Sequence, residues 1–162
     1  MAAGIKTYLD RYGCDLRWTL SGTPPGTVRT AVVIPVLAEW AHLFRTLASI
    51  SRNDPRSLAE TVVICVVNNG LPGVARSRDR RDNQRTLAVL RRLANGRARP
   101  DDAGGYGTAI AAGGLSIGYI DASSPGRELP AGGGGVGLAR KIGMDRALEL
   151  FDHRSASPNN LL

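Results

Sequence analysis

Short runs of consecutive apolar residues alternate along the chain with longer segments in which apolar residues recur every three or four positions. The runs are rich in Val and Ile, which is typical of strands buried on both faces of a sheet. The periodic segments are typical of amphipathic helices. The strands are predicted at 30–36, 61–69 and 115–121, and the helices at 39–51, 83–95 and 137–151.

The order of strand and helix, repeated three times, predicts an α/β fold with a mostly parallel sheet flanked by helices. The length of 162 residues fits one domain. Residues 1–30 are polar and turn-rich and predict an N-terminal lead-in, so that the domain itself covers 31–162. Pro35 cannot donate a backbone hydrogen bond and is expected to mark the end of the first strand. The segment 97–114 favours neither helix nor strand, and residues 161–162 resemble the start of another strand.

Ligands of parallel α/β sheets bind at the carboxyl ends of the strands. Here the first strand is followed by Glu39, and the second ends at Asn68 and Asn69. Glu39 could accept hydrogen bonds from a ribose or base, or could simply favour the start of a helix. The asparagine pair could bind the edge of a base or form a plain turn. If these side chains bind a ligand, we expect them to face one shared crevice that Arg140 enters from another side.

The glycine-rich segment 132–137 has the spacing G-x-G-x-x-G. A dinucleotide-binding loop of this kind follows its strand directly, whereas ten residues with two prolines separate Asp121 from these glycines. A phosphate-binding Gly-Lys-Ser/Thr sequence is also missing from the chain. We interpret the first glycines as a flexible loop. The helix predicted to begin at Gly137 would still offer free amide groups to an anion, with Arg140 and Lys141 adding charge.

Composition narrows the classes of partner without choosing one. The net charge of +7, mostly from Arg, favours anionic partners such as phosphorylated small molecules, acidic membrane surfaces or nucleic acid. The arginine-rich segment 76–99 is interrupted by acids and lacks aromatic residues, so it is interpreted as a solvated face rather than a stacking platform for single strands. The two cysteines form no Cys-x-x-Cys pair, which argues against a zinc site.

The sequence contains no candidate catalytic residue and no candidate metal ligand at a recognisable spacing. His42 and His153 have no Ser or Cys nucleophile at a recognisable spacing. The first residues lack the apolar core of a signal peptide, and no apolar run approaches the roughly 18 residues of a membrane-spanning helix. We therefore expect a cytoplasmic protein.

Three segments in register resemble the start of family 2 glycosyltransferases, which have the Rossmann-like GT-A fold. They are 32-VVIPVLAE-39, 62-VVICVVNNG-70 and 136-VGLARKIGMDRAL-148. The resemblance implies that the chain is the nucleotide-binding portion of a hexosyltransferase, with a UDP-sugar or GDP-sugar donor. In that family the first two strand ends hold the nucleoside, and the last helix begins near the diphosphate. The implied donor-binding residues are Pro35, Val36, Glu39, Asn68, Asn69, Gly137, Arg140 and Lys141.

The chain also departs from the family pattern. Leu37 and Ala38 stand where the family has an aromatic residue and Asn, and Lys141 replaces another Asn. The Asp-X-Asp motif that binds Mg²⁺ or Mn²⁺ would follow the last helix, and these 162 residues lack it and the catalytic base. The resemblance thus implies a truncated chain that binds the donor but does not transfer the sugar by itself, with the metal expected only in a full-length protein. The edge of the first strand that the next strand would cover is expected to be bare and to promote self-association.

Three other hypotheses stay open. The chain could be a non-catalytic α/β module that binds a nucleotide or a partner. It could instead bind nucleic acid through its arginine face, although the leading hypothesis expects no nucleic acid. A dinucleotide-dependent oxidoreductase is the third, and peripheral contact with a membrane is compatible with the charge.

Overall fold

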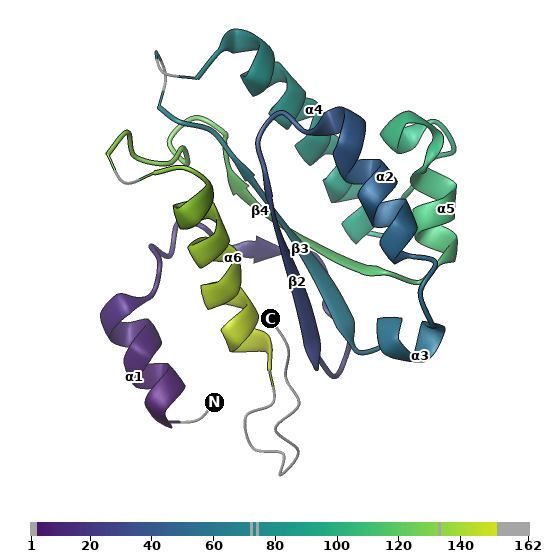
Figure 1. The fold of residues 1–162 in the computed structure, drawn as a ribbon, viewed down its shortest axis with the longest axis horizontal. Helices are drawn as coiled ribbons and strands as arrows, with labels where there is room; N and C mark the ends of the chain where they lie inside the picture. Colours follow the sequence, from purple (N-terminus) through teal and green to yellow (C-terminus); the bar gives the residue numbers. More distant parts are fainter. Residues whose placement is uncertain (1–2, 72, 74, 133, 152–162) are drawn as a thin grey trace.

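The computed structural model describes residues 3–151 apart from 72, 74 and 133, and its centre is a four-stranded sheet (Figure 1). The strands lie in the order β1-β4-β3-β2. The three longer strands, β2 (Thr30–Val36), β3 (Thr61–Asn68) and β4 (Ser116–Ala122), run parallel to one another. The short strand β1 (Leu20–Ser21) pairs antiparallel with β4. The sheet is therefore mixed, with β1 and β2 as its two edges.

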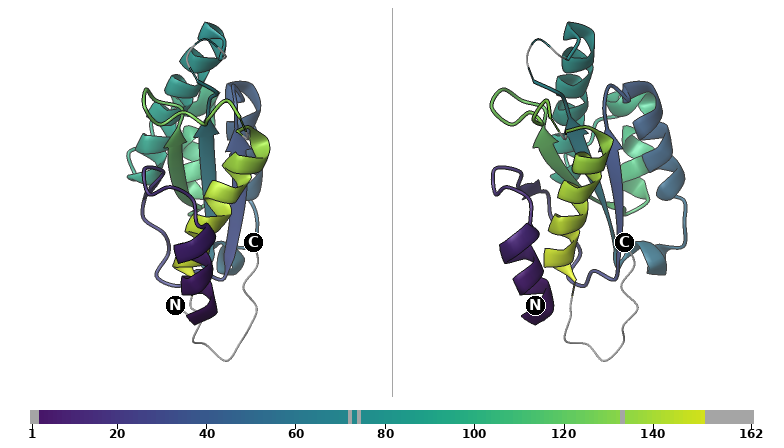
Figure 2. Two further views of the ribbon diagram at one scale, coloured as in Figure 1. Left: turned by 90° about the vertical axis from the view of Figure 1, so that its left-hand side faces the viewer. Right: turned by 60° about the vertical axis from the view of Figure 1, so that its left-hand side comes forward.

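Helices cover both faces of this sheet (Figures 1 and 2). One face carries α2 (Trp40–Ile50), α4 (Ser77–Ala94), α5 (Gly107–Ala112) and the short 3₁₀ helix η1 (Asp102–Gly105). The opposite face carries α6 (Val136–Leu150), which packs on β2 and β3, and α1 (Ala3–Tyr12) lies against the outer side of α6. The single-turn helix α3 (Pro55–Leu58) leads from α2 into β3.

The sheet separates two hydrophobic clusters. All eight residues of β3 are buried, because helices cover this central strand on both sides. Its alternate residues therefore join different clusters: Val67 packs in the cluster with α2 and α4, and Val66 in the cluster with α6. By the same alternation, the last residue of the strand, Asn68, faces the α6 side.

The backbone of α6 lies very close to the sheet at Gly143. A Cβ atom at this position would lie 2.3 Å from Cγ1 of Val33 and 2.9 Å from Cγ2 of Val66. Both neighbours are packed in the core, so a side chain could be accommodated only by moving the helix. Glycine at this position therefore allows α6 to rest directly on β2 and β3.

The predicted α/β class is confirmed, and each of the three predicted strands and three predicted helices is present. Five of these six elements begin and end within one residue of their predicted bounds. The exception is α4, which begins at Ser77 rather than at 83. Each of its first six residues is Arg, Asp or Ser. These residues are tolerated in an exposed helix, but they contain no apolar periodicity from which the helix could be predicted. Pro35 lies inside β2, one residue before its end, as an edge strand permits.

Other parts of the chain differ from expectation. The predicted lead-in contains α1 and β1, and the segment 97–114 contains η1 and α5. These elements are short and depend on partners distant in sequence, so local patterns do not reveal them. The predicted start of a strand at 161–162 and the residue His153 lie outside the described residues. No helix in the described part of the chain has the length and apolar character needed to cross a membrane.

Candidate functional site

The carboxyl ends of the three parallel strands meet at one edge of the sheet. Val36 at the end of β2 is level with Val67 of β3, and Asn68 is level with Ala122 at the end of β4. The N-termini of α2, α4 and α6 begin at this same edge (Figure 1). The edge therefore combines strand ends with helix N-termini, where ligands of α/β proteins bind.

Two buried asparagines hold these strand ends together. The Nδ2 atom of Asn83, in α4, donates to the carbonyl of Asn68 at 2.9 Å and to Oδ1 of Asn69 at 2.6 Å. The Oδ1 atom of Asn83 accepts from the amide of Ala38 at 2.8 Å, and Asn69 donates to the carbonyl of Ser123 at 3.0 Å. Both side chains are 0% exposed. Asn69, a predicted ligand-binding residue, thus joins the ends of β3 and β4 instead of facing solvent.

Asn68 is placed differently. It is 4% exposed, yet its side-chain amide makes no hydrogen bond with any residue that the structure describes. The amide is not one of the buried polar groups left unsatisfied, since among the described residues only Oγ1 of Thr86 is in that state. Asn68 is the predicted residue whose side chain is best placed to meet a ligand at this edge, because it ends β3 and no described residue bonds its amide.

The first turn of α6 lies on the same side of the sheet as Asn68. Val66 contacts α6 at Gly143, and Asn68 lies two residues further along β3. Both Asn68 and the first turn of α6 lie beyond this contact, toward the carboxyl edge of the sheet (Figure 1). The helix is capped by Gly135, with φ 103°, and no side chain caps it. The amide groups of its first turn are therefore open to an external anion.

Pro35, Val36 and Glu39 line a small cavity of about 170 Å³ on the α2 side of the sheet, together with His42. Glu39 is exposed at the start of α2, and its side chain makes no capping hydrogen bond. The lining of this cavity includes neither asparagine of the predicted pair nor Arg140. The structure thus places Glu39 and Asn68 on opposite faces of the sheet and does not unite the predicted residues in one crevice.

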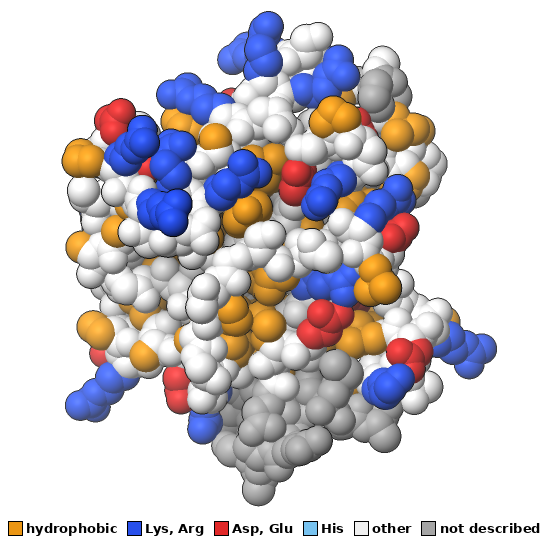
Figure 3. Space-filling model, turned by 180° about the vertical axis from the view of Figure 1, so that it is seen from behind, with side chains coloured by type: hydrophobic (Ala, Val, Ile, Leu, Met, Phe, Trp, Pro, Cys, Tyr) orange, Lys and Arg blue, Asp and Glu red, His pale blue; other side chains and the backbone are white. Residues whose placement is uncertain are grey.

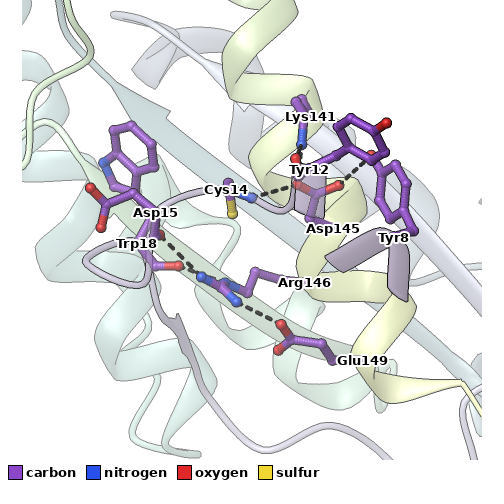
Figure 4. A network of polar contacts seen from close by, with 9 residues as sticks. All are labelled: Tyr8, Tyr12, Cys14, Asp15, Trp18, Lys141, Asp145, Arg146 and Glu149. Carbon is purple, nitrogen blue, oxygen red and sulfur yellow. Dashed lines mark hydrogen bonds and ion pairs between the residues drawn. The ribbon is translucent and has the colours of Figure 1, made fainter. Parts of the chain in front are cut away.

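The two predicted basic residues of α6 also diverge. Arg140 is exposed and lies about one turn after the start of the helix. Gly137, in the first turn, is also exposed. Lys141 instead points toward α1, where its Nζ donates to a carboxylate oxygen of Asp145 and to the carbonyl of Tyr12 (Figure 4). Burial lowers the pKa of Lys141, but the hydrogen bond and the charge of Asp145 outweigh it, so that the net pKa is raised. Lys141 is therefore engaged within the fold.

The N-terminal segment is fastened to α6 by a network of buried polar groups that the sequence did not predict (Figure 4). Asp145, 2% exposed, also accepts from the Tyr8 hydroxyl at 3.1 Å and from the Cys14 amide at 2.8 Å. Arg146 donates to the carbonyls of Trp18, at 2.8 Å, and of Asp15, at 3.1 Å, and to Glu149 at 2.6 Å. An Asp-Arg pair amid the apolar residues of α6 was the available signal, but its partners in the N-terminal segment lie more than 120 residues away.

Arginines form the second notable surface near the carboxyl edge. Seen from behind, Lys and Arg side chains are spread over the upper part of the molecule (Figure 3). Helix α4 presents exposed Arg78, Arg81, Arg85 and Arg91, and none of them forms an ion pair with a residue that the structure describes. The guanidinium of Arg85 lies 3.6 Å from the centre of the Trp40 ring. The aromatic residue missing from the arginine-rich segment is thus supplied by α2.

Comparisons with models of known protein families, with curated proteins and with solved structures found no match to this chain. Within the described residues, no group of three or more His, Cys, Asp or Glu side chains could hold a metal ion. Function is therefore inferred from the geometry of the site and from the motifs of the sequence.

Proposed function

We propose that the chain binds the nucleotide part of a nucleotide-sugar at the carboxyl edge of its parallel strands, with the diphosphate at the first turn of α6. It would do so as the donor-binding portion of a family 2-like glycosyltransferase with a Rossmann-like GT-A fold, inactive in transfer by itself. The three motifs that resemble this family fall on β2, on β3 and on α6. Their carboxyl-edge ends support the proposal because they place polar groups where such folds bind ligands.

Asn68 is the observation that carries the proposal. It is the last residue of the central strand, it is almost fully buried, and its amide has no partner among the described residues. An amide group offers both a donor and an acceptor, which suits the hydrogen-bonding edge of a nucleobase or a ribose hydroxyl. The open amides of the α6 first turn suit the diphosphate. Arg140, exposed one turn further along, adds positive charge.

The expectation that Glu39, Asn68 and Asn69 share one crevice was wrong, so the proposal rests on a smaller set of residues on the α6 side of the sheet. Asn69 keeps the strand ends in place, and Lys141 is held by Asp145. Pro35, Val36 and Glu39 border the edge from the α2 side. A Mg²⁺ or Mn²⁺ ion would supply charge neutralisation at a leaving diphosphate. The described residues offer no ligand cluster for such an ion, so we assign it no site and no step.

Calorimetric titration with UDP, GDP and UDP-glucose tests the proposal, with NAD as a negative control. We expect the uridine or guanosine nucleotides to bind weakly, with dissociation constants of roughly 0.1–1 mM, because the described residues offer no ligand group for a metal beside the diphosphate. Absence of binding by all three compounds at about 10 mM would refute the proposal, as would equal binding of NAD.

Two variants locate the site. Asn68→Ala removes the unpartnered amide, and Val136→Pro removes one first-turn amide at a helix position that favours proline. Each is expected to weaken nucleotide binding about threefold to tenfold, whereas Asn95→Ala, at the opposite end of α4, should leave it unchanged. Unaltered affinity in both test variants would place the nucleotide elsewhere.

The arginine face of α4 supports a second candidate, the binding of nucleic acid through phosphate contacts. Four exposed arginines without acidic partners among the described residues provide charge, whereas Trp40 is engaged by Arg85 and Phe44 within the fold. Binding to random-sequence DNA should then weaken steeply with salt, with a slope of about one per phosphate contacted. A salt-independent or undetectable interaction would exclude this candidate.

A further inference from the structure

A cavity of about 360 Å³ opens between the N-terminal half of α4 and the loop that follows β4. It lies at the carboxyl edge, but its lining shares no residue with the site proposed for the nucleotide. The lining residues are Arg80, Arg81, Gln84, Ser123, Pro125 and Glu128. The cavity thus brings two guanidinium groups and a carboxylate to one small volume.

Glu128 is the unusual member of this lining. Its side chain is largely buried, since the residue is 8% exposed, and Oε2 accepts from the amide of Gly126 at 2.6 Å. Within the described part of the chain, Oε1 has no hydrogen-bond partner and no Lys or Arg forms an ion pair with the carboxylate. Among the described residues the buried side-chain atom without a partner is Oγ1 of Thr86, not Oε1 of Glu128, so Oε1 is open to the cavity. A hydrogen-bond donor of a ligand in the cavity could therefore reach this oxygen.

The two arginines are likewise uncompensated. Arg80 and Arg81 form no ion pair with any described residue, although they border the same cavity as Glu128. The nearby wall is held in place by other contacts. Gln84 donates to the hydroxyls of Ser123 and Ser124 at 3.2 Å each, and Asp121 accepts from the amides of these two serines. The Ser123 hydroxyl, which accepts from Gln84, keeps its own proton available for donation.

We propose that this cavity binds a small polyhydroxylated anion of the phosphorylated-sugar class. The phosphate would lie between Arg80 and Arg81, which suit its oxygens, and a sugar hydroxyl would donate to Oε1 of Glu128. An anion without hydroxyl groups would pair with Arg80 and Arg81 but would donate no hydrogen bond to Glu128. An uncharged sugar would bond Glu128 but would leave the two arginines unpaired. A molecule with both a phosphate and a hydroxyl group would interact with all three side chains. The proposal is independent of nucleotide binding at Asn68.

Calorimetric or NMR titration with three probes tests whether the cavity requires both a phosphate and a hydroxyl group in its ligand. Glucose 6-phosphate carries both features, inorganic phosphate carries only the anion, and glucose carries only the hydroxyls. We expect glucose 6-phosphate to bind at least roughly tenfold more tightly than either of the others, since it gains a hydrogen bond to a charged acceptor. Equal binding of phosphate and glucose 6-phosphate, or binding of neither, would overturn the proposal.

Variants assign the binding to this cavity. Glu128→Gln keeps the shape of the side chain and should abolish most of the preference for glucose 6-phosphate over phosphate. It should not lower thermal stability, because the charge it removes has no ion-pair partner among the described residues. A large loss of stability with an unchanged preference would show that Glu128 is purely structural.

The matched control uses a second cavity that also contains two arginines. Arg45 and Arg52 line a cavity of about 500 Å³ beside Tyr106, with no carboxylate in its lining. The double variants Arg80→Gln/Arg81→Gln and Arg45→Gln/Arg52→Gln change the net charge equally. We expect only the first to weaken glucose 6-phosphate binding, by roughly tenfold or more. Equal weakening by both would indicate a general charge effect and contradict the assigned site.

Discussion

The polar groups at the two ends of α6 differ in whether other residues of the chain form hydrogen bonds with them. In the C-terminal half, Asp145 and Arg146 are buried, and the N-terminal segment supplies acceptors or donors for both. In the first turn, no side chain caps the helix, and the adjacent amide of Asn68 has no partner among the described residues. Asp145 and Arg146 are thus satisfied from within the chain, whereas the first-turn amides of α6 and the amide of Asn68 are not bonded by side chains of the described residues. This contrast separates residues of structural importance from candidate binding residues on a single helix.

The strongest test of the contrast removes Asp145. We expect Asp145→Ala to lower the free energy of unfolding by about 3 kcal/mol, because Lys141, the Tyr8 hydroxyl and the Cys14 amide all lose their acceptor. Urea denaturation measures the effect. Asp10→Ala is the matched control, since its exposed pair with Lys6 should contribute less than about 1 kcal/mol. Similar losses in the two variants would show that the C-terminal half of α6 is not specially secured.

A second test follows the release of the N-terminal segment through its cysteine. Burial raises the pKa of the Cys14 thiol, with Arg146 opposing the rise and Asp145 adding to it, and burial raises the pKa of Cys65 to about 12. In the Asp145→Ala variant, Cys14 should react with a thiol reagent at pH 8 roughly tenfold faster, because the segment detaches more often and because loss of the Asp145 charge lowers the pKa of the thiol. Mass spectrometry of the modified peptides separates the two thiols.

Cys65 serves as the internal reference in this measurement. It lies in the core of β3 and is 0% exposed, so it reacts only when the sheet opens. Equal acceleration at both cysteines would indicate that Asp145 stabilises the fold as a whole rather than the contact with the N-terminal segment.

The smallest expected effect is at the other end of the helix. Val136→Pro should change the free energy of unfolding by no more than about 0.5 kcal/mol, because the lost amide has no partner within the helix and proline suits its first position. Thermal and urea unfolding of the variant check this value. A loss of about 2 kcal/mol or more would mean that the first-turn amide is used by the fold and is not free for a ligand.

A further prediction compares the two sides of β2. One side pairs along its whole length with β3, whereas the other borders no strand of the described sheet. We therefore expect reversible self-association through this edge, with the mass observed by sedimentation rising with concentration. A single monomeric species up to the highest soluble concentration would contradict it, and Pro35 would then be sufficient to protect the edge.

The parts of the fold that depend on local sequence were predictable. Strands β2, β3 and β4 are continuous apolar runs, and a run of this kind identifies a buried strand without knowledge of its neighbours. The parallel arrangement that brings the ends of these strands to one edge of the sheet was also predicted. In contrast, α1 lies on α6 through contacts that span more than 120 residues, and no local pattern encodes them.

The details of the candidate site were only partly accessible from the sequence. Asn68 and Asn69 are adjacent, yet the side chain of Asn69 bonds Asn83, 14 positions away, whereas Asn68 bonds Asn83 only through its carbonyl. The separation of Glu39 from Asn68 follows from the alternation of side chains along β3, where Asn68 continues the series that faces α6. The alternation of side chains along β3 could be deduced from the sequence. Which side of the sheet each helix covers could not be deduced from it.

The closeness of α6 to the sheet at Gly143 has a consequence for the opposite end of the helix. Because a single missing methyl group determines how deeply the helix sits, it also sets the height of the first-turn amides above Asn68. Restoring that methyl group would lift the helix away from β2 and β3, without altering any residue of the first turn. The depth at which α6 sits on the sheet is thus governed from the middle of the helix, by a residue that has no side chain.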